Sequence, residues 1–217
     1  MTDELKAQLE SSDGRRIFAD FLRSIGKESA LDKFDKLTDL YFQVNSVVNI
    51  SGLKTVDDIY IKHYLDSAYP QDKFAGTVCD VGCGGGFPSL PLAILTDCTV
   101  TGLDSVGKKL LLIHRAVTEL QLKNIKADYA RSEDLVKLGR KYDTVCARAL
   151  ADADKALSFC APLAAVGGRV ILYRTQNDAA AKPQTAEKCG VSLSETVDYD
   201  LPETDIKRRL LVYKKEN

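Results

Sequence analysis

The residues best suited to chemistry are a glycine cluster and the two acidic residues on either side of it. Asp80 follows the β-prone run TVC, and four of the five positions from 82 to 86 are glycine. Glycines gather at a strand–helix junction where the backbone must turn tightly or come very close to a ligand. Asp104 ends the next hydrophobic run, CTVTGLD, where a carboxylate can accept hydrogen bonds from ribose hydroxyls. The pattern indicates a site for an adenosyl ligand.

The spacing of the cluster narrows the choice of ligand. In the dinucleotide pattern G-x-G-x-x-G counted from Gly82, the third glycine position falls on Phe87. Asp80 at the strand end would repel a pyrophosphate but tolerates a cationic or neutral ligand. These features favour S-adenosyl-L-methionine, which has a sulfonium and no phosphates, over NAD. The alternative is an ordinary tight strand–helix turn.

Alternating strand and helix patterns are expected to position these residues. After the glycine loop, strands are predicted at CTVTGLD, IKADYA, YDTVCARA, GGRVILYR, VSLSETVDY and RRLLVYKK, with helices between the earlier ones and over Asp178–Cys189. The last two strands are close enough in sequence to form an antiparallel pair. With Thr77–Val81 as the first strand, the predicted fold class is α/β: a seven-stranded, mostly parallel, Rossmann-like class I methyltransferase sheet.

The first part of the chain shows helical periodicity and no strand alternation. Residues 1–70 are therefore predicted to be a helical N-terminal extension, and residues 71–217 an S-adenosylmethionine-binding methyltransferase domain.

A polar segment joins these two parts. Thr55 with Asp58 three residues later predicts a helix N-cap. On that helix, His63 falls on one face with Asp66 or Ser67. Spacing alone favours a hydrogen-bonded cluster that docks the extension over a catalytic role.

Composition argues against several classes of protein. A net charge of −1 is unlike that of proteins that coat nucleic acid non-specifically. No apolar run reaches the roughly 18 residues of a transmembrane helix, so we expect a cytoplasmic protein without a membrane partner. The six cysteines form no C-x-x-C pair and the two histidines are too few for zinc, so we predict buried cysteines and no metal site.

Several longer segments are more specific than the glycine loop. They are NISGLKTVDDIYIKHYLDS, DVGCGGGFPSLPLAI, GLDSVGKKLLLIHRAVTELQLKNI, ARSEDL, YDTVCARAL and the ending KRRLLVYKK. Together they cover most of the chain, and they resemble the glucose-inhibited division protein B family, the 16S ribosomal RNA guanine-N7 methyltransferases. The resemblance implies S-adenosyl-L-methionine as cofactor and 16S ribosomal RNA as partner. We expect the substrate to be a small-subunit particle and the protein to be a monomer.

The resemblance and the spacing together name the expected site residues. Matching motif to motif places the cofactor on Gly82, Phe87, Asp104, Ser105, Val106, Ser132, Glu133 and Arg148, and the residue pattern adds Asp80 and Gly84. RNA phosphates are expected on Arg131, Arg148, Arg174 and Arg208, with help from Lys207, Arg209, Arg15 and Arg16. For Arg15 and Arg16, the favoured interpretation is that they are solvated surface cations without an RNA contact.

The chain departs from the family pattern at two places. Arg174 and Thr175 stand where the family usually has a lysine and a glycine, and Ser89 replaces the usual glycine beside Pro88. Arginine is a planar fork and lysine a point charge, so the first change bears on substrate contacts. Neither change removes a predicted cofactor residue.

No catalytic acid or base is predicted. The segment CARAL lacks the Pro-Pro-aromatic motif of many exocyclic-amine methyltransferases, and Cys146 and Cys160 lack a proline-cysteine context. Guanine N7 has a free lone pair, so positioning alone suffices. The alternatives are a class I methyltransferase for a small molecule or a protein, an RNA-binding module that binds the cofactor without activity, and an NAD-dependent enzyme.

Overall fold

Seven strands form one sheet in the computed structural model, which describes residues 1–216. The strands are β1 (Thr77–Val81), β2 (Thr99–Asp104), β3 (Ile125–Tyr129), β4 (Tyr142–Arg148), β5 (Ala164–Thr175), β6 (Val191–Asp200) and β7 (Lys207–Lys215). Their order in the sheet is β3-β2-β1-β4-β5-β7-β6. The first five are parallel to one another, and β7 is antiparallel to both β5 and β6. The predicted α/β sheet with its terminal antiparallel pair is confirmed.

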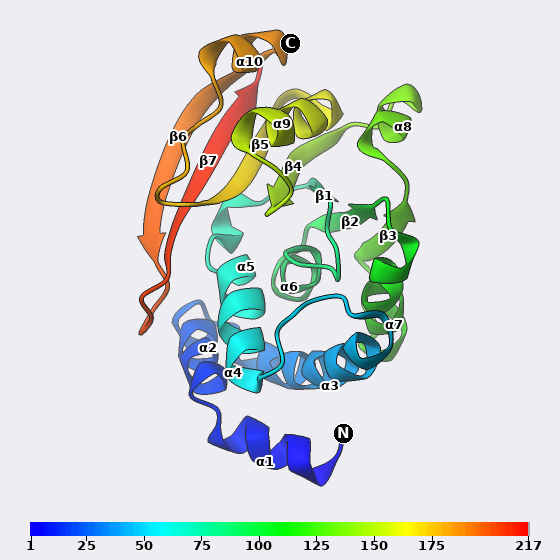
Figure 1. The fold of residues 1–217 in the computed structure, drawn as a ribbon, viewed down its shortest axis with the longest axis vertical. Coiled ribbons are helices and arrows are strands. Elements are labelled where there is room, and N and C mark those ends of the chain that lie inside the picture. Colours follow the sequence, from blue (N-terminus) through cyan, green and yellow to red (C-terminus); the bar gives the residue numbers. More distant parts are fainter. Residues whose placement is uncertain (217) are drawn as a thin grey trace.

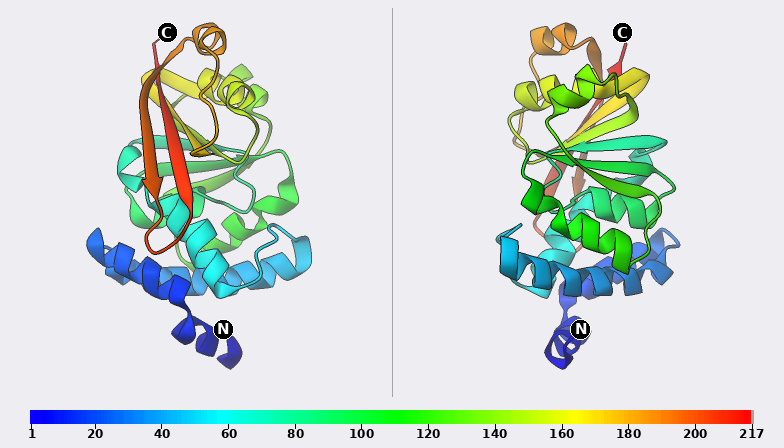
Figure 2. Two further views of the ribbon diagram at one scale, coloured as in Figure 1. Left: turned by 60° about the vertical axis from the view of Figure 1, so that its left-hand side comes forward. Right: turned by 90° about the vertical axis from the view of Figure 1, so that its right-hand side faces the viewer.

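Helices cover both faces of the sheet, as parallel strands require (Figures 1 and 2). Side chains alternate along each strand, so in β4 Val145 and Ala147 enter one core and Cys146 the other. One face is covered by α8 (Ser132–Lys137), α9 (Ala153–Cys160) and α10 (Pro183–Lys188), and the other by α6 (Ser89–Leu95), α7 (Leu111–Glu119) and the N-terminal helices.

The N-terminal helices pack onto the sheet through an aromatic core. They are α1 (Asp3–Ser11), α2 (Asp13–Ser24), α3 (Leu31–Val48) and a helix formed by α4 (Val56–Asp58), a π-helical turn (Ile59–Leu65) and α5 (Asp66–Ala68). Phe18, Phe34, Tyr60 and Tyr64 are fully buried and contact one another edge-on or tilted. These helices share one continuous core with a face of the sheet, and the division at residue 70 stays a prediction.

Two predicted helices differ in their bounds. The helix predicted over Asp178–Cys189 is restricted to α10, because Pro183 holds Lys182 in an extended conformation and supplies the first helical residue. The helix after β2 starts as a 3-10 turn (Gly107–Leu110) before α7. Other 3-10 turns span Glu28–Ala30, Gln71–Lys73 and Ala161–Leu163. No helix within residues 1–216 is both long and apolar enough to cross a bilayer.

Candidate active site

Two adjoining cavities open at the carboxyl ends of the parallel strands. The larger has a volume of about 540 Å³ and the smaller about 330 Å³. Gly82, after β1, and Ala149, after β4, line both cavities. The strand order reverses between β1 and β4, and this is where ligands bind in open α/β sheets. Both volumes are in the range of about 300–1,000 Å³ found for small-molecule sites.

The small cavity brings together the predicted residues that follow β2 and β3. Its lining includes Asp104, Ser105, Val106, Arg131, Ser132 and Glu133. Asp104 is only 7% exposed but contributes to the cavity wall. The cavity therefore presents a carboxylate on one side, and the serine and glutamate that begin α8 on another.

The glycine loop between the cavities is fixed by β2. The Leu103 carbonyl accepts hydrogen bonds from the N–H groups of Gly82 (2.8 Å) and Cys83 (3.0 Å). One Asp104 oxygen accepts from the Gly84 N–H at 2.9 Å, and the other accepts from the Val106 N–H at 2.8 Å. Asp104 thus shapes the loop as well as lining the small cavity.

Asp80 lies behind the loop and not in it. The side chain is fully buried and lines neither cavity, and its Oδ2 accepts hydrogen bonds from Ser89 Oγ (2.6 Å) and Ser89 N (3.2 Å). Burial raises the pKa of Asp80 to about 6, although the Ser89 hydroxyl opposes this shift. Within residues 1–216 Asp80 Oδ1 has no hydrogen-bond partner. Ser89, which stands where the family usually has a glycine, therefore donates hydrogen bonds to Asp80, a residue predicted to bind the cofactor.

Phe87 and His63 form the aromatic wall of the large cavity. Their rings stack with centroids 4.2 Å apart and an angle of 3° between the planes. His63 Nδ1 lies 3.2 Å from Arg148 Nη2, and His63 Nε2 lies 3.0 Å from Ser51 Oγ. An arginine can only donate, so Nδ1 accepts and the proton resides on Nε2. Burial, and then the nearby guanidinium, lower the pKa of His63 to about 3, so the ring is neutral at physiological pH.

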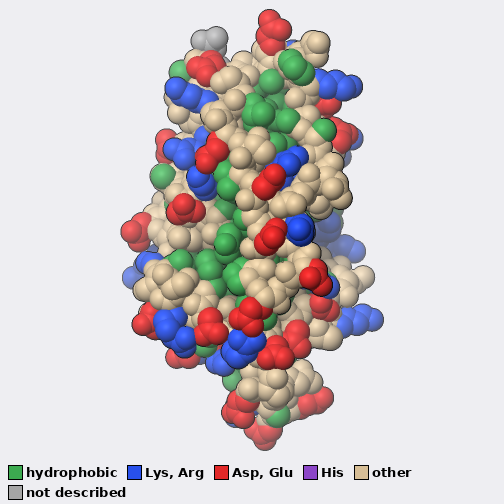
Figure 3. Space-filling model, turned by 90° about the vertical axis from the view of Figure 1, so that its left-hand side faces the viewer, with side chains coloured by type: hydrophobic (Ala, Val, Ile, Leu, Met, Phe, Trp, Pro, Cys, Tyr) green, Lys and Arg blue, Asp and Glu red, His purple; other side chains and the backbone are tan. Residues whose placement is uncertain are grey.

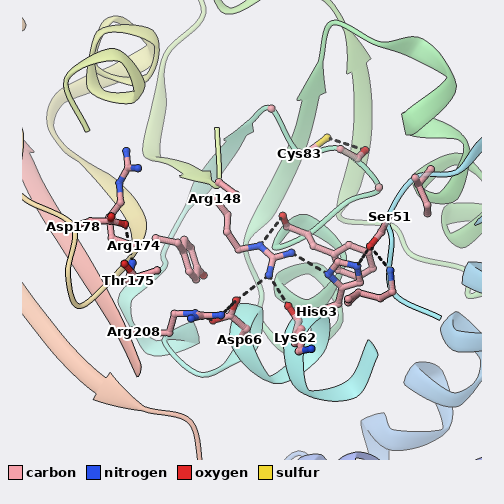
Figure 4. Close-up of a pocket in the computed structure, with 18 residues that line it drawn as sticks. Ser51, Lys62, His63, Asp66, Cys83, Arg148, Arg174, Thr175, Asp178 and Arg208 are labelled. Atoms are coloured by element: carbon pink, nitrogen blue, oxygen red, sulfur yellow. Dashed lines mark hydrogen bonds and ion pairs between the residues drawn. The ribbon is translucent and has the colours of Figure 1, made fainter. Parts of the chain in front are cut away.

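Arg148 joins three parts of the structure at the centre of the large cavity (Figure 4). Its Nη1 donates to Asp66 Oδ2 at 3.0 Å and to the Lys62 carbonyl at 2.8 Å, and its Nε donates to the Phe87 carbonyl at 3.4 Å. Arg208, from β7, donates to the other Asp66 oxygen at 2.7 Å. Asp66 is 4% exposed, so the two arginines share one buried carboxylate.

The large cavity has more cationic than acidic side chains. Lys62, Arg148, Arg174 and Arg208 line it together with only two carboxylates, Asp66 and Asp178. Arg174 donates to the Ala151 carbonyl through Nη1, while its buried Nε has no partner in the described part of the chain. Arg174, Thr175 and Asp178 lie on one side of the cavity, with Ser51 and His63 on the other (Figure 4).

Other predicted cations lie elsewhere. Arg131 lines the small cavity, not the large one with the other three arginines. Arg15 pairs with Asp35 at 2.8 Å, Arg16 with Glu203 at 2.9 Å and Arg209 with Asp198 at 2.7 Å, and none of the three lines either cavity. Lys207 is exposed.

Sequence reasoning missed several residues of the large cavity. Ser51, Lys62, Tyr173 and Asp178 carry no expected site role, although all four line the cavity. The hydrogen-bonded cluster predicted around His63 is present, because His63 and Asp66 both contact Arg148 of β4, and it also lines the cavity. The specific segment KHYLDS was the available signal, because it places Lys62, His63 and Asp66 together.

The cysteines do not supply a nucleophile here. Five are buried, as predicted, whereas Cys189 is half-buried and departs from the prediction. Cys83 lines the large cavity but is 3% exposed, and burial raises the pKa of its thiol. Within residues 1–216, no three His, Cys, Asp or Glu side chains cluster closely enough to hold a metal ion.

Comparisons with known proteins agree with this geometry. The family model of rRNA small subunit methyltransferase G (GidB) matches residues 30–212. Ribosomal RNA small subunit methyltransferase G from Lactobacillus johnsonii is 33% identical, over 92% of this chain and 90% of that protein. Its counterpart from Lachnoclostridium phytofermentans is 32% identical, over 91% and 88%. A SAM dependent methyltransferase from Aquifex aeolicus has the same fold, with a TM-score of 0.56 and 16% identity over 77% of this chain and 97% of that one.

Proposed function

This chain belongs to the rRNA small subunit methyltransferase G family, and we propose that it transfers a methyl group from S-adenosyl-L-methionine to N7 of one guanine in 16S ribosomal RNA. The observation that carries this proposal is the pair of cavities joined at Gly82. One suits a nucleoside and the other an aromatic base beside cations. We also expect the protein to act in the cytoplasm, on a small-subunit particle and as a monomer.

The residues at the junction suit the methyl donor. Asp104 would accept hydrogen bonds from the ribose hydroxyls, and Ser132 and Glu133 would face the adenine. Gly84 has no heavy atom within 4 Å of where a Cβ would stand, so the loop leaves room for a ligand. The unpartnered Oδ1 of Asp80 would favour the positive α-ammonium group of the amino-acid end from behind the loop.

The chemistry needs little from the protein beyond positioning. The donor supplies an electrophilic methyl on a sulfonium, and guanine N7 has a free lone pair. Phe87 and His63 stack on each other and line the large cavity, so the base would contact the accessible part of this stack. Neutral His63 adds no charge beside the sulfonium. The cationic side chains that line the large cavity would bind RNA phosphates.

Methyl transfer with a labelled donor tests the proposal. Unmodified small-subunit particles are incubated with the protein and S-adenosyl-L-methionine labelled in its methyl group, and the labelled base is then mapped. We expect label in one guanine of 16S RNA, at N7. Label on another atom, or on protein or small molecules in place of RNA, would overturn the assignment.

A further inference from the structure

Asp178 is the carboxylate of the large cavity that is available to a ligand. Asp66, the other carboxylate, accepts from Arg208 at Oδ1 and from Arg148 at Oδ2. Asp178 Oδ2 accepts one hydrogen bond, from the Thr175 N–H at 3.0 Å. Within residues 1–216, Asp178 Oδ1 makes no hydrogen bond or ion pair. We propose that Asp178 binds the Watson–Crick edge of the target guanine and so selects guanine over adenine.

The position of Asp178 fits that edge of the base. Asp178 follows the end of β5, on the side of the cavity away from Ser51 and His63 (Figure 4). The inference rests on the proposed function, in which N7 points toward the methyl donor at the glycine loop. N1 and the N2 amino group lie on the opposite edge of a purine from N7. A guanine with N7 toward the glycine loop therefore directs its N1–H and N2–H to the opposite side of the cavity, where Asp178 lies across from Cys83 of that loop (Figure 4).

The chemistry of the carboxylate matches guanine and not adenine. An ionised carboxylate is an acceptor only, and guanine presents two adjacent donors, N1–H and N2–H. Adenine has no N2 amino group and an N1 lone pair, so it would place acceptor against acceptor. A site built to hydrogen-bond one base leaves its polar group unpaired with the other, which is a basis for discrimination.

The Asp178→Asn variant separates this role from a structural one. The asparagine oxygen can still accept from the Thr175 N–H, which keeps the turn after β5. Its NH₂ group then faces the base, where donor meets donor. Asp205, an exposed carboxylate in the β6–β7 turn that lines neither cavity, provides the matched control Asp205→Asn. Thermal melting and donor affinity of each variant check that the fold and the donor site persist.

The experiment measures methyl transfer onto small-subunit particles that carry either guanine or inosine at the mapped position, since inosine lacks the N2 amino group. Asp178→Asn should lower kcat/KM on guanine about 10- to 100-fold. Wild type should lose a similar factor on inosine. On inosine, kcat/KM of the variant should fall by less than about a further threefold, since the N2–H contact that inosine lacks is already lost in the variant. Asp205→Asn should match wild type on both substrates.

Three results would overturn the role of Asp178. Asp178→Asn within threefold of wild type on guanine would do so. The role would also be overturned if the loss in kcat/KM of Asp178→Asn on inosine equalled the product of the two separate losses. Both results leave the proposed function intact. A wild-type protein that labels no guanine would overturn the proposed function, and the role of Asp178 with it.

Discussion

At the scale of single residues, the site depends on one buried carboxylate shared by two arginines. Asp66 faces Arg148 on one oxygen and Arg208 on the other, and Arg148 also holds the Phe87 carbonyl of the glycine loop. Arg148 was predicted to contact ligands, yet most of its donors already have protein partners. We infer that it acts largely by holding Phe87 and His63 in place.

Removing the charge of Asp66 should destabilise the fold strongly. Asp66→Asn leaves two guanidinium groups without a counter-charge in a buried position, a change that costs about 3–5 kcal/mol in the free energy of unfolding. The control Asp198→Asn breaks the exposed pair with Arg209, which solvent screens, and should cost far less. Urea unfolding followed by circular dichroism measures both. Equal costs would show that burial of the Asp66 cluster is unimportant.

His63 should make the fold sensitive to acid. Its pKa is lowered from 6.5 to about 3 on folding, so between these values the unfolded chain binds more protons than the folded one. Stability from this group is therefore lost as pH falls below about 6.5. Asp80 contributes with the opposite sign, because its pKa is raised from 3.8 to about 6, but it is common to wild type and variant.

The test compares wild type with His63→Gln, which removes the titrating ring. The free energy of unfolding is measured from about pH 7.5 to about pH 4.5. Wild type should lose more stability than the variant across this range. The slopes of their unfolding free energies against pH should differ by at most the value for one bound proton. Parallel curves would mean that His63 titrates normally in the folded protein.

At the scale of elements, the glycine loop combines left-handed backbone with open space. Gly84 has φ +56°, and nothing lies within 4 Å of where its Cβ would stand. Gly139 is a matched control, with φ +69° and equally open surroundings, and it lines neither cavity. Alanine at either position should cost about 1–2 kcal/mol of stability through the backbone alone.

Of these two variants, only Gly84→Ala should weaken binding of the methyl donor. The methyl group of Gly84→Ala lies at the large cavity, where we place the amino-acid end of the donor, whereas Gly139→Ala leaves both cavities unchanged. Calorimetric titration with S-adenosyl-L-methionine should show affinity reduced at least tenfold in Gly84→Ala and retained in Gly139→Ala. Equal affinities would place the donor away from the loop.

The elements near the site were more predictable than the contacts between them. Local patterns identified all seven strands, the glycine loop and Asp104, because strand alternation and glycine clustering are short-range signals. The prediction that Asp178 begins a helix is wrong, because Pro183 is a local signal that disfavours helix at Lys182 and marks the first helical residue. The partners of Asp66 come from positions 148 and 208, and only the sheet order brings them together.

At the scale of the whole molecule, charge is mixed on the surface and biased in the large cavity. The face that carries β6 and β7 shows basic and acidic side chains interspersed (Figure 3), in keeping with a net charge of −1. The large cavity instead has four cations and two carboxylates. This arrangement suits a structured RNA that reaches into the cavity better than non-specific coating.

Salt dependence should locate the RNA contact. The affinity for small-subunit particles should fall steeply with salt, and Arg174→Gln should reduce the slope of log affinity against log salt by about 0.7–0.9, the value of one phosphate contact. Arg16→Gln removes a cation that pairs with Glu203 outside the cavities, so its slope should match wild type. A reduced slope in Arg16→Gln with an unchanged slope in Arg174→Gln would instead place the RNA contact on the N-terminal helices.

The central claim is that the two cavities form one site, in which the donor extends past Gly82 from the small cavity into the large one and the guanine base lies in the large cavity. A crystal structure with S-adenosyl-L-homocysteine, the demethylated donor, tests this most directly. We predict adenosine in the small cavity with its ribose hydroxyls on Asp104, and the amino-acid end passing Gly82 into the large cavity. A donor held wholly in the large cavity, or bound elsewhere with Asp104 unengaged, would contradict the account.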